Sequence, residues 1–394
     1  MKLERVFLMM LIEKLSLEQV EYKPFNEVCE YIRGITYNKS QEAKEENEKN
    51  WKVLRANNID LQRKVLDLRD VKEVDSSVKV KESQRLRKND ILICAGSGSK
   101  EHIGKVAFIT EDMDYTFGGF MAVIRVISEK INSRFLFHIL AGNLFSEFLA
   151  KKLNVSTINN LNSSLIKNFQ IPLPPLPIQQ EIVRILDTFT NLMAELTAEL
   201  TARRKQYEYY RDELLTFGED VPRMTLKDIS VSVSSGKNKE KEQEGMYPVY
   251  GSTGVIGRTN TAKYSKEQIL VARVGANAGF VHKANGTYDV SDNTIIVELK
   301  DNYNLQYVYY ILQKMNLRKY AKGGGQPLVT AGELKKIEIP IPDINEQDRV
   351  VSILDKFTGI STSFDSGLPA EIAARQKQYE YYRERLLSFK ESHR

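Results

Sequence analysis

Apolar and aromatic residues recur at alternating intervals of three and four over residues 178–217. This spacing places them along one side of a helix and is typical of coiled-coil seams. An additional interval of four between Leu196 and Leu200 is a stutter in the heptad pattern. A helix over this range is about 60 Å long, at about 1.5 Å per residue. The seam consists of Ile182, Ile185, Phe189, Leu192, Leu196, Leu200, Tyr207, Tyr210, Leu214 and Phe217.

A second seam of the same kind over residues 350–389 predicts a second long helix. Gly367-Leu368-Pro369 interrupts it, and because proline cannot continue a helix we expect a kink or break there. Two seams in one chain can be buried against each other as an antiparallel coiled coil. The alternative is that each seam packs on its own neighbouring domain.

The two helical regions are copies of one another. A first block, residues 171–190, returns as 339–358 with ten of 20 positions identical. A second block, residues 203–217, returns as 375–389 with 11 of 15 identical. Each first block begins with a proline-rich segment, which predicts extended backbone before the helix.

The segments that lie outside the blocks share an outline but little sequence. Each contains a strand-like run, Asp90–Cys94 and Gln268–Ala272, and later a helix-like run, 135–149 and 305–317. We therefore predict an α+β protein with two globular α/β domains, separated by two long antiparallel coiled-coil helices in a pseudo-two-fold internal repeat. The predicted domains are 1–170 (with an N-terminal helix), 171–220 (a central helical spacer), 221–338, and 339–394 (a C-terminal helical spacer).

Charge is distributed unevenly along the chain, whose net charge is +5. Residues 18–170 carry a net +3 and residues 221–338 a net +6, whereas 171–220 and 339–394 carry −4 and −1. Two positive bodies with acidic connectors are the distribution expected if the bodies contact phosphate. Chance variation on solvated surfaces can also produce differences of this size.

The duplicated motifs resemble those of the specificity subunits of type I restriction–modification enzymes, over essentially the whole chain. The matching segments are Gln179-Gln180-Glu181 and Glu346-Gln347, both Ile-Leu-Asp-x-Phe-Thr runs, both Lys-Gln-Tyr-Glu-Tyr-Tyr-Arg runs, the segment 247–257, and Gly323-Gly-Gly-Gln-Pro327. The resemblance implies that each globular domain is a target-recognition domain that reads one half of a split site in double-stranded DNA. It implies that the paired helices set the gap and dock two methyltransferase subunits, which a restriction subunit joins. S-adenosylmethionine, ATP and magnesium are then expected on the partner subunits, and no cofactor on this chain.

Loop residues that can bond base edges or phosphates are the candidate DNA contacts. For any one of them alone, a solvated loop residue is the better explanation, but as sets they indicate a binding edge. In the first domain they are Asn38, Lys39, Arg55, Asn57, Ser97 and Lys100. In the second they are Lys237, Tyr250, Ser252, Thr253, Arg258, Arg273, Asn277, Lys322 and Gln326. The candidate anchors for subunit docking are Tyr207, Tyr210, Tyr379 and Tyr382.

Two segments carry part of an enzyme motif. Residues 96–105 resemble a phosphate-binding loop but lack its first glycine, and Val106 stands where magnesium binding needs Ser or Thr. Asp289 with Glu298-Leu299-Lys300 matches a nuclease spacing that arises easily by chance. The sequence has no Asn/Asp-Pro-Pro-Tyr/Phe segment to hold a flipped adenine. We expect no catalytic centre and no metal. A one-chain nuclease or methyltransferase, and a scaffold that docks partners without binding DNA, remain the alternatives.

Cysteine usage and hydropathy predict a cytoplasmic protein. The two cysteines, Cys29 and Cys94, form no CxxC motif, which favours a reducing compartment. The apolar run at 6–12 is short for a signal peptide, and no run approaches the length of a membrane span.

Overall fold

The chain divides into two compact units. In the computed structural model, unit 1 comprises Met1–Glu195 and Ala373–Arg394, and unit 2 comprises Leu196–Ile372. The residues that the structure describes are 12–13, 19–45, 47–60, 64–97, 102–153, 160–239, 244–322, 327–361 and 367–392. Most of the predicted N-terminal helix lies outside these ranges.

Unit 1 is built on an antiparallel sheet with the strand order β2-β8-β5-β6. The central strand β5 is buried at every position because alternate side chains enter different cores. Ile91 and Ile93 join the core with the helices, whereas Leu92 and Cys94 join a second core. The strands are β2 (Cys29–Arg33), β8 (Met121–Val126), β5 (Ile91–Cys94) and β6 (Val106–Phe108).

A smaller sheet of unit 1 has the order β4-β3-β7. Its strands are β4 (Lys72–Val74), β3 (Trp51–Leu54) and β7 (Tyr115–Phe117). β3 pairs antiparallel with β4 but parallel with β7.

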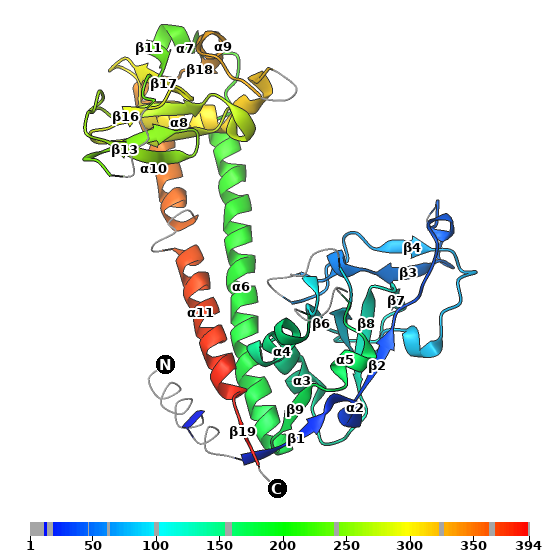
Figure 1. The fold of residues 1–394 in the computed structure, drawn as a ribbon. Helices are drawn as coiled ribbons and strands as arrows, with labels where there is room; N and C mark the ends of the chain where they lie inside the picture. The colour runs from blue at the N-terminus through cyan, green and yellow to red at the C-terminus, as the bar shows by residue number, and fades with distance from the viewer. Residues whose placement is uncertain are drawn as a thin grey trace. The chain divides into compact units, whose positions relative to one another are not determined.

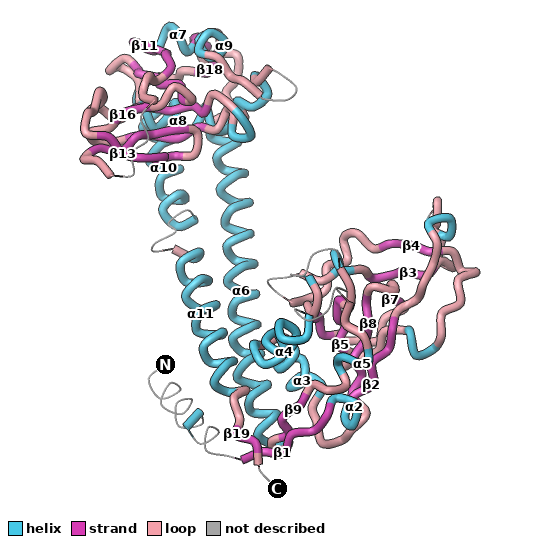
Figure 2. Tube along the Cα trace, in the orientation of Figure 1, coloured by secondary structure: helices cyan, strands magenta, loops and turns pink. Residues whose placement is uncertain are grey.

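Unit 2 repeats this plan. Its larger sheet has the order β11-β17-β14-β15, and its smaller sheet, β13-β12-β16, again contains one parallel pair, β12 with β16. Figure 2 shows these strands gathered beside the short helices of the unit. Two repeated domains of mixed helix and sheet were predicted, and this is confirmed. The strands are β11 (Ser230–Ser235), β17 (Thr294–Leu299), β14 (Gln268–Ala272), β15 (Val281–Ala284), β13 (Gly254–Thr259), β12 (Tyr247–Gly251) and β16 (Asp289–Val290).

The proline-rich segments take part in one further strand pair in each unit. In unit 1, β1 (Gln19–Pro24) pairs antiparallel with β9 (Gln170–Leu173). In unit 2, β10 (Arg223–Thr225) pairs with β18 (Glu338–Pro340). Unit 1 adds β19 (Lys390–Glu391), which is parallel to β1. The extended backbone expected before each long helix is therefore present.

The helix predicted over 135–149 is instead two helices, α3 (Ser133–Leu140) and α4 (Asn143–Leu153). The run is helical as predicted except at Ala141-Gly142, where the Gly142 amide bonds the Ile139 carbonyl at 3.0 Å. In unit 2, α8 (Leu305–Lys314) is followed by a short 3-10 helix, Leu317–Tyr320. Four further short α-helices are α2 (Phe25–Val28), α5 (Ser163–Ile166), α7 (Leu226–Ile229) and α9 (Ala331–Lys335).

Three longer helices carry the duplicated blocks (Figure 1). The first copy forms α6 (Leu176–Leu214), 39 residues long. The second copy forms α10 (Ile344–Ser361) and α11 (Leu368–Leu386). α11 therefore begins within the Gly-Leu-Pro sequence at the predicted break, and residues 362–366, which precede it, lie outside the described residues.

Each unit combines the first block of one copy with the second block of the other. The core of unit 1 contains Ile182 and Leu186 together with Leu386. The core of unit 2 contains Val350 and Leu354 together with Leu215. Aromatic pairs join the same blocks: Phe189 with Tyr382, ring centres 5.6 Å apart, and Tyr210 with Phe357, 5.2 Å apart.

A buried glutamine in each first block joins two helices of its unit. Gln179 joins α6 to α3, and Gln347 joins α10 to α8. The Gln179 side chain accepts a hydrogen bond from the Asn132 amide at 2.8 Å and donates to the Pro174 carbonyl at 2.7 Å. Gln347 makes the corresponding bonds in unit 2, accepting from Asn304 at 3.0 Å and donating to Pro342 at 2.8 Å. The asparagines cap α3 and α8, so the glutamines fix where those helices begin.

Candidate nucleic-acid interface

A turn at the same place in both units organises the candidate DNA contacts. It is Gly118-Gly119-Phe120, between β7 and β8, in unit 1, and Ser291-Asp292-Asn293, between β16 and β17, in unit 2. The Phe120 carbonyl accepts from the Ala95 amide at 2.8 Å, and the Asn293 carbonyl accepts from the Arg273 amide at 2.9 Å. Each turn is therefore bonded to the end of the central strand.

A glycine packs under each turn so closely that no side chain fits. A Cβ on Gly34 would lie 2.2 Å from the Gly118 carbonyl oxygen, and one on Gly236 would lie 2.4 Å from the Ser291 carbonyl oxygen. Both glycines directly follow the first strand of the larger sheet. In each unit, the turn and the residues that follow the glycine therefore lie close together and form one surface.

In unit 1 this surface encloses a cavity of about 770 Å³, which we call the first cavity. Four of the six predicted contacts line it: Lys39, Arg55, Asn57 and Ser97. Asn38 precedes Lys39, and its backbone amide donates to the Gln41 side chain at 2.9 Å. Lys100 lies outside the described residues. The remaining lining is Ile35, Thr36, Tyr37, Glu42, Ala56, Gly96, Gly118, Gly119, Phe120 and Met121.

One carboxylate, that of Asp70, holds two of these contacts. It accepts from Arg55 Nη2 at 3.1 Å and from Asn57 Nδ2 at 2.8 Å. Asp70 is 75% exposed, so this ion pair contributes only about 0–1 kcal/mol to stability. An anionic or hydrogen-bonding ligand can therefore replace Asp70 at little cost.

In unit 2 three predicted contacts bond the 291–293 turn. Ser252 Oγ donates to the Asn293 carbonyl at 3.0 Å, and Arg273 Nη1 donates to the Asp292 carbonyl at 3.3 Å. The Tyr250 carbonyl accepts from the Ser291 amide at 2.9 Å. Exposed Lys237 directly follows Gly236, so it lies beside the same turn. Exposed Thr253 shares the β12–β13 connection with Ser252.

The other predicted contacts of unit 2 lie elsewhere. Arg258 donates to the Gly245 and Met246 carbonyls at 2.6 and 2.8 Å, so its guanidinium holds the start of a hairpin. Lys322 forms an ion pair with Glu333 at 2.8 Å. Gln326 is not among the described residues.

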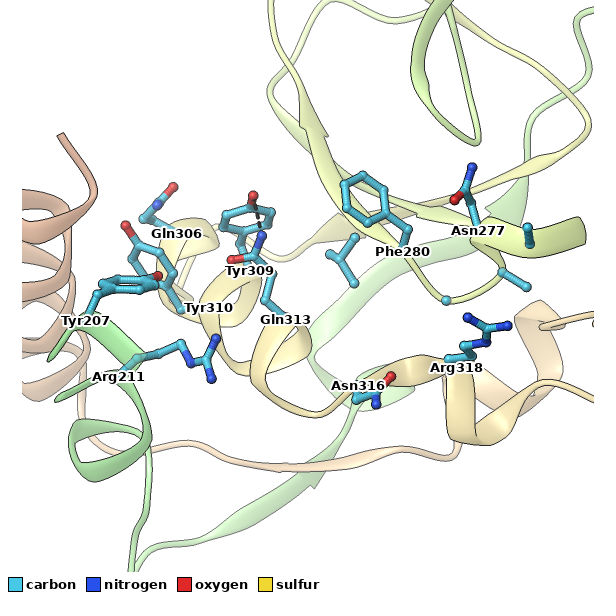
Figure 3. Close-up of a pocket in the computed structure, with 14 residues that line it drawn as sticks. Tyr207, Arg211, Asn277, Phe280, Gln306, Tyr309, Tyr310, Gln313, Asn316 and Arg318 are labelled. Atoms are coloured by element: carbon cyan, nitrogen blue, oxygen red, sulfur yellow. Dashed lines mark hydrogen bonds between the residues drawn. The ribbon is translucent and has the colours of Figure 1, made fainter. Parts of the chain in front are cut away.

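Asn277 lines a second cavity of about 650 Å³, shown in Figure 3. Arg211 and Tyr207 of α6 line it, as do Tyr309 and Gln313 of α8, which are hydrogen-bonded at 2.6 Å. Sequence reasoning missed Arg211 and Arg318 here because neither lies in a loop rich in glycine. The lining that the structure describes carries these two arginines and no carboxylate: Tyr207, Arg211, Ala276, Asn277, Ala278, Gly279, Phe280, Val281, Gln306, Tyr309, Tyr310, Gln313, Asn316 and Arg318.

The predicted docking tyrosines are engaged within their own units. Tyr210 stacks on Phe357 and Tyr382 packs on Phe189, while Tyr379 is 8% exposed. Tyr207 lines the second cavity. The outward-facing tyrosines of the duplicated run are its neighbours Tyr209 and Tyr381, 64% and 48% exposed. They were missed because they lie off the apolar seam. The available signal was that a large aromatic is identical in both copies.

The residues of the nuclease-like spacing are used in structural hydrogen bonds. Buried Asp289 accepts from Asn238 Nδ2 at 2.9 Å, Glu298 accepts from Ser232 Oγ at 3.2 Å, and Lys300 Nζ donates to the Asp228 carbonyl at 2.6 Å. Within the described ranges, no group of three or more His, Cys, Asp or Glu is placed to hold a metal ion.

Comparison with known proteins gives the same family at several levels. The family "Type I restriction modification DNA specificity domain" matches residues 18–203 and 219–374. The chain is 30% identical over 309 residues to the specificity subunit of the type I restriction enzyme EcoprrI from Escherichia coli, covering 73% of this chain and 76% of that one. It is 37% identical over 257 residues to the EcoR124I/EcoR124II specificity subunit from the same organism, covering 57% and 63%.

Solved structures share the fold. The S subunit of a type I restriction–modification system from M. genitalium superposes with a TM-score of 0.58 at 15% identity, covering 95% of this chain and 98% of that one. A chain from a structural study of complex assembly and conformational transition in the type I R-M system gives a TM-score of 0.57 at 15% identity, covering 94% and 97%. In the described part of this chain, no helix is both long and apolar enough to cross a bilayer.

Proposed function

Since the chain belongs to the type I restriction–modification DNA specificity family, whose members recognise the DNA target and do not catalyse its modification or cleavage, we propose that its two units read the two halves of a bipartite site. The observation that carries this proposal is the equivalent turn in each unit. One strand order presents two different sets of side chains at the same place. A shared scaffold with unlike contacts suits two different half-sites.

Within each unit, cations would bond phosphates and set the register, while amides and hydroxyls would read base edges. In unit 1 these roles fall to Lys39 and Arg55 for phosphate, and to Asn57 and Ser97 for bases. In unit 2, Lys237 and Arg273 would contact phosphate, and Ser252 a base edge. Each domain alone would bind weakly, and joining the two raises affinity through effective concentration.

The duplicated helices would act as an antiparallel coiled-coil spacer and as the docking surface for partner proteins. The aromatic pairs Phe189–Tyr382 and Tyr210–Phe357 support pairing of the blocks within each unit. The exposed Tyr209 and Tyr381 occupy equivalent positions, which suits two copies of one partner. We assign these positions to two methyltransferase subunits, with a restriction subunit joining that core. S-adenosylmethionine, ATP and magnesium would then bind to those partners.

The test is to purify the chain alone and with the methyltransferase subunit of its own system. The complex should methylate one bipartite sequence in a randomised duplex library, and the isolated chain none. Duplex affinity should fall steeply between 50 and 200 mM salt, because phosphate contacts release counterions. A scaffold without DNA recognition would give no salt-dependent duplex binding, and that result would refute the proposal.

A further inference from the structure

Phe120 is the most exposed large hydrophobic side chain in the described part of the chain, at 72%. It lies on the 118–120 turn and lines the first cavity together with Lys39, Arg55, Asn57 and Ser97. An aromatic ring left in water at such a place is unfavourable for the isolated protein. Single exposed apolar side chains are common on protein surfaces. Phe120 differs because it lies among four candidate DNA contacts, and this position suits a contact with a binding partner.

The backbone under the ring is held rigidly. The Phe120 carbonyl accepts from the amides of Ala95 and Gly96 at 2.8 and 2.9 Å. Arg33 Nε donates to the Gly119 carbonyl at 2.8 Å, and the Met121 amide bonds the Gly118 carbonyl at 2.7 Å. A ring on a fixed turn loses little backbone freedom on binding, so it can discriminate between ligands rather than adapt to them.

Unit 2 carries Asn293 at the equivalent position. Its carbonyl accepts from the Arg273 amide just as that of Phe120 accepts from the Ala95 amide. One backbone geometry therefore presents an apolar ring in unit 1 and an amide in unit 2. A position that changes chemistry on an unchanged scaffold is suited to setting specificity.

The ligand follows from the surroundings of the ring. Lys39 and Arg55 supply positive charge for phosphate, and Asn57 and Ser97 have groups that bond base edges. The apolar group that base edges display in the major groove is the C5-methyl of thymine, which phenylalanine contacts. Because the ring shares a cavity wall with edge-reading groups, contact with a base edge fits better than insertion between base pairs.

We propose that Phe120 is a specificity-determining residue that contacts a thymine methyl group in the half-site read by unit 1. The inference rests on the proposed function. Phe120 would account for one base preference in one half-site. A different preference is expected at the equivalent position of the other half-site, where unit 2 carries Asn293.

The experiment uses the complex with the methyltransferase subunit and a randomised duplex library. Phe120→Ala should lower the preference for thymine at one position of one half-site by about fourfold, the effect expected from losing the burial of one methyl group. Phe120→Asn, which copies the residue of unit 2, should shift that position away from thymine. Ile127→Ala removes another exposed side chain of unit 1, at 60% exposure and outside the first cavity, and should leave every preference unchanged.

Uracil in place of that thymine isolates the methyl group. It should weaken the wild-type complex about as much as Phe120→Ala does, and should not weaken the Phe120→Ala complex further. The second half-site is an internal control, because its unchanged preference shows that the variant has folded and assembled.

Three results would overturn the inference. Unchanged preferences in Phe120→Ala would show that the ring makes no specific contact. A uracil effect of the same size in the variant and the wild type would place the methyl contact elsewhere. Unstacking reported by 2-aminopurine next to the position, without a uracil effect, would show insertion between bases. If the wild-type complex binds no duplex at all, the proposed function itself fails, which is a separate outcome.

Discussion

The buried side chain of Gln179 bonds the Asn132 amide at 2.8 Å, and this contact joins the start of α3 to α6. Its amide nitrogen also donates to the Lys130 and Pro174 carbonyls at 2.8 and 2.7 Å. Gln179→Ala should lower the free energy of unfolding of unit 1 by about 2–4 kcal/mol, because buried backbone groups lose their partners. Urea unfolding measures it. The adjacent Gln180, which is exposed, is the matched control, and Gln180→Ala should change little.

A second prediction concerns acid stability of unit 2. Burial lowers the pKa of His282 from 6.5 to about 4. The unfolded chain therefore binds the proton more tightly than the native one. Above pH 6.5 the histidine does not change the free energy of unfolding of unit 2. As the pH falls from 6.5 toward 4 it lowers this free energy, and below pH 4 its effect is constant. Allowing for partial solvent screening, the loss is about 2 kcal/mol.

His282→Phe retains an aromatic ring beside Tyr250 and Phe280, which stack on the histidine at 6.3 and 5.8 Å. The free energy of unfolding of unit 2, measured by hydrogen exchange, should therefore depend less on pH between 7 and 4.5 in this variant than in the wild type. An identical pH dependence in both proteins would assign the acid sensitivity to other groups.

The exposed and packed tyrosines of the duplicated run should behave differently. Tyr209→Asp with Tyr381→Asp should leave the chain folded and weaken binding of the methyltransferase subunit at least tenfold, because large aromatics dominate interfaces. Tyr210→Asp with Tyr382→Asp should unfold the long helices that carry the duplicated blocks, because each tyrosine packs on a phenylalanine. Thermal unfolding and co-purification separate the two effects. A folded Tyr209/Tyr381 variant that binds normally would remove these positions from the docking surface.

Each unit should read its half-site independently. Replacing residues 221–338 with the matching domain of a relative should change one half of the methylated sequence and preserve the other. Methylome sequencing of a host that expresses the chimaera provides the readout. A change in both halves would contradict independent reading.

The length of α6 should set the spacing between half-sites. Residues 193–200 read Met-Ala-Glu-Leu-Thr-Ala-Glu-Leu, good helix formers in a near-repeat of four. An extra Thr-Ala-Glu-Leu after Leu200 adds about 6 Å and about 40° of rotation beyond a full turn. One base pair supplies about 3.4 Å and about 35°. We expect the spacer to lengthen by one or two base pairs, with both half-sites unchanged, and we favour one because it nearly matches the added rotation. Methylation of a randomised library by the insertion variant measures the spacing. An unchanged spacer would show that the length of α6 does not set it.

Patterns local in sequence predicted much of the fold. The run Gln268–Ala272, apolar from Ile269 onward, is β14, because a strand buried on both faces needs no alternation. Pairing between distant segments could not be predicted in the same way. The seam of residues 178–217 has the same spacing whichever helix it contacts, so the spacing alone did not decide between pairing of the two seams and packing of each seam on its own neighbouring domain. Arg258 was predicted as a DNA contact because arginine commonly contacts DNA. Its bonds to Gly245 and Met246 depend on a hairpin register that the residues alone do not specify.

The exchange of blocks also gives the two units different histories during synthesis. Unit 2 is one continuous stretch, 196–372, so the ribosome delivers all of its core before the chain is finished. Unit 1 needs Leu386 and Phe389, which are made after all of unit 2, to complete a core begun by Phe25. Since domains fold as they emerge, the second half of the protein can fold before the first is complete. A nascent chain that stops before residue 373 would carry a finished unit 2 and an open hydrophobic surface on unit 1.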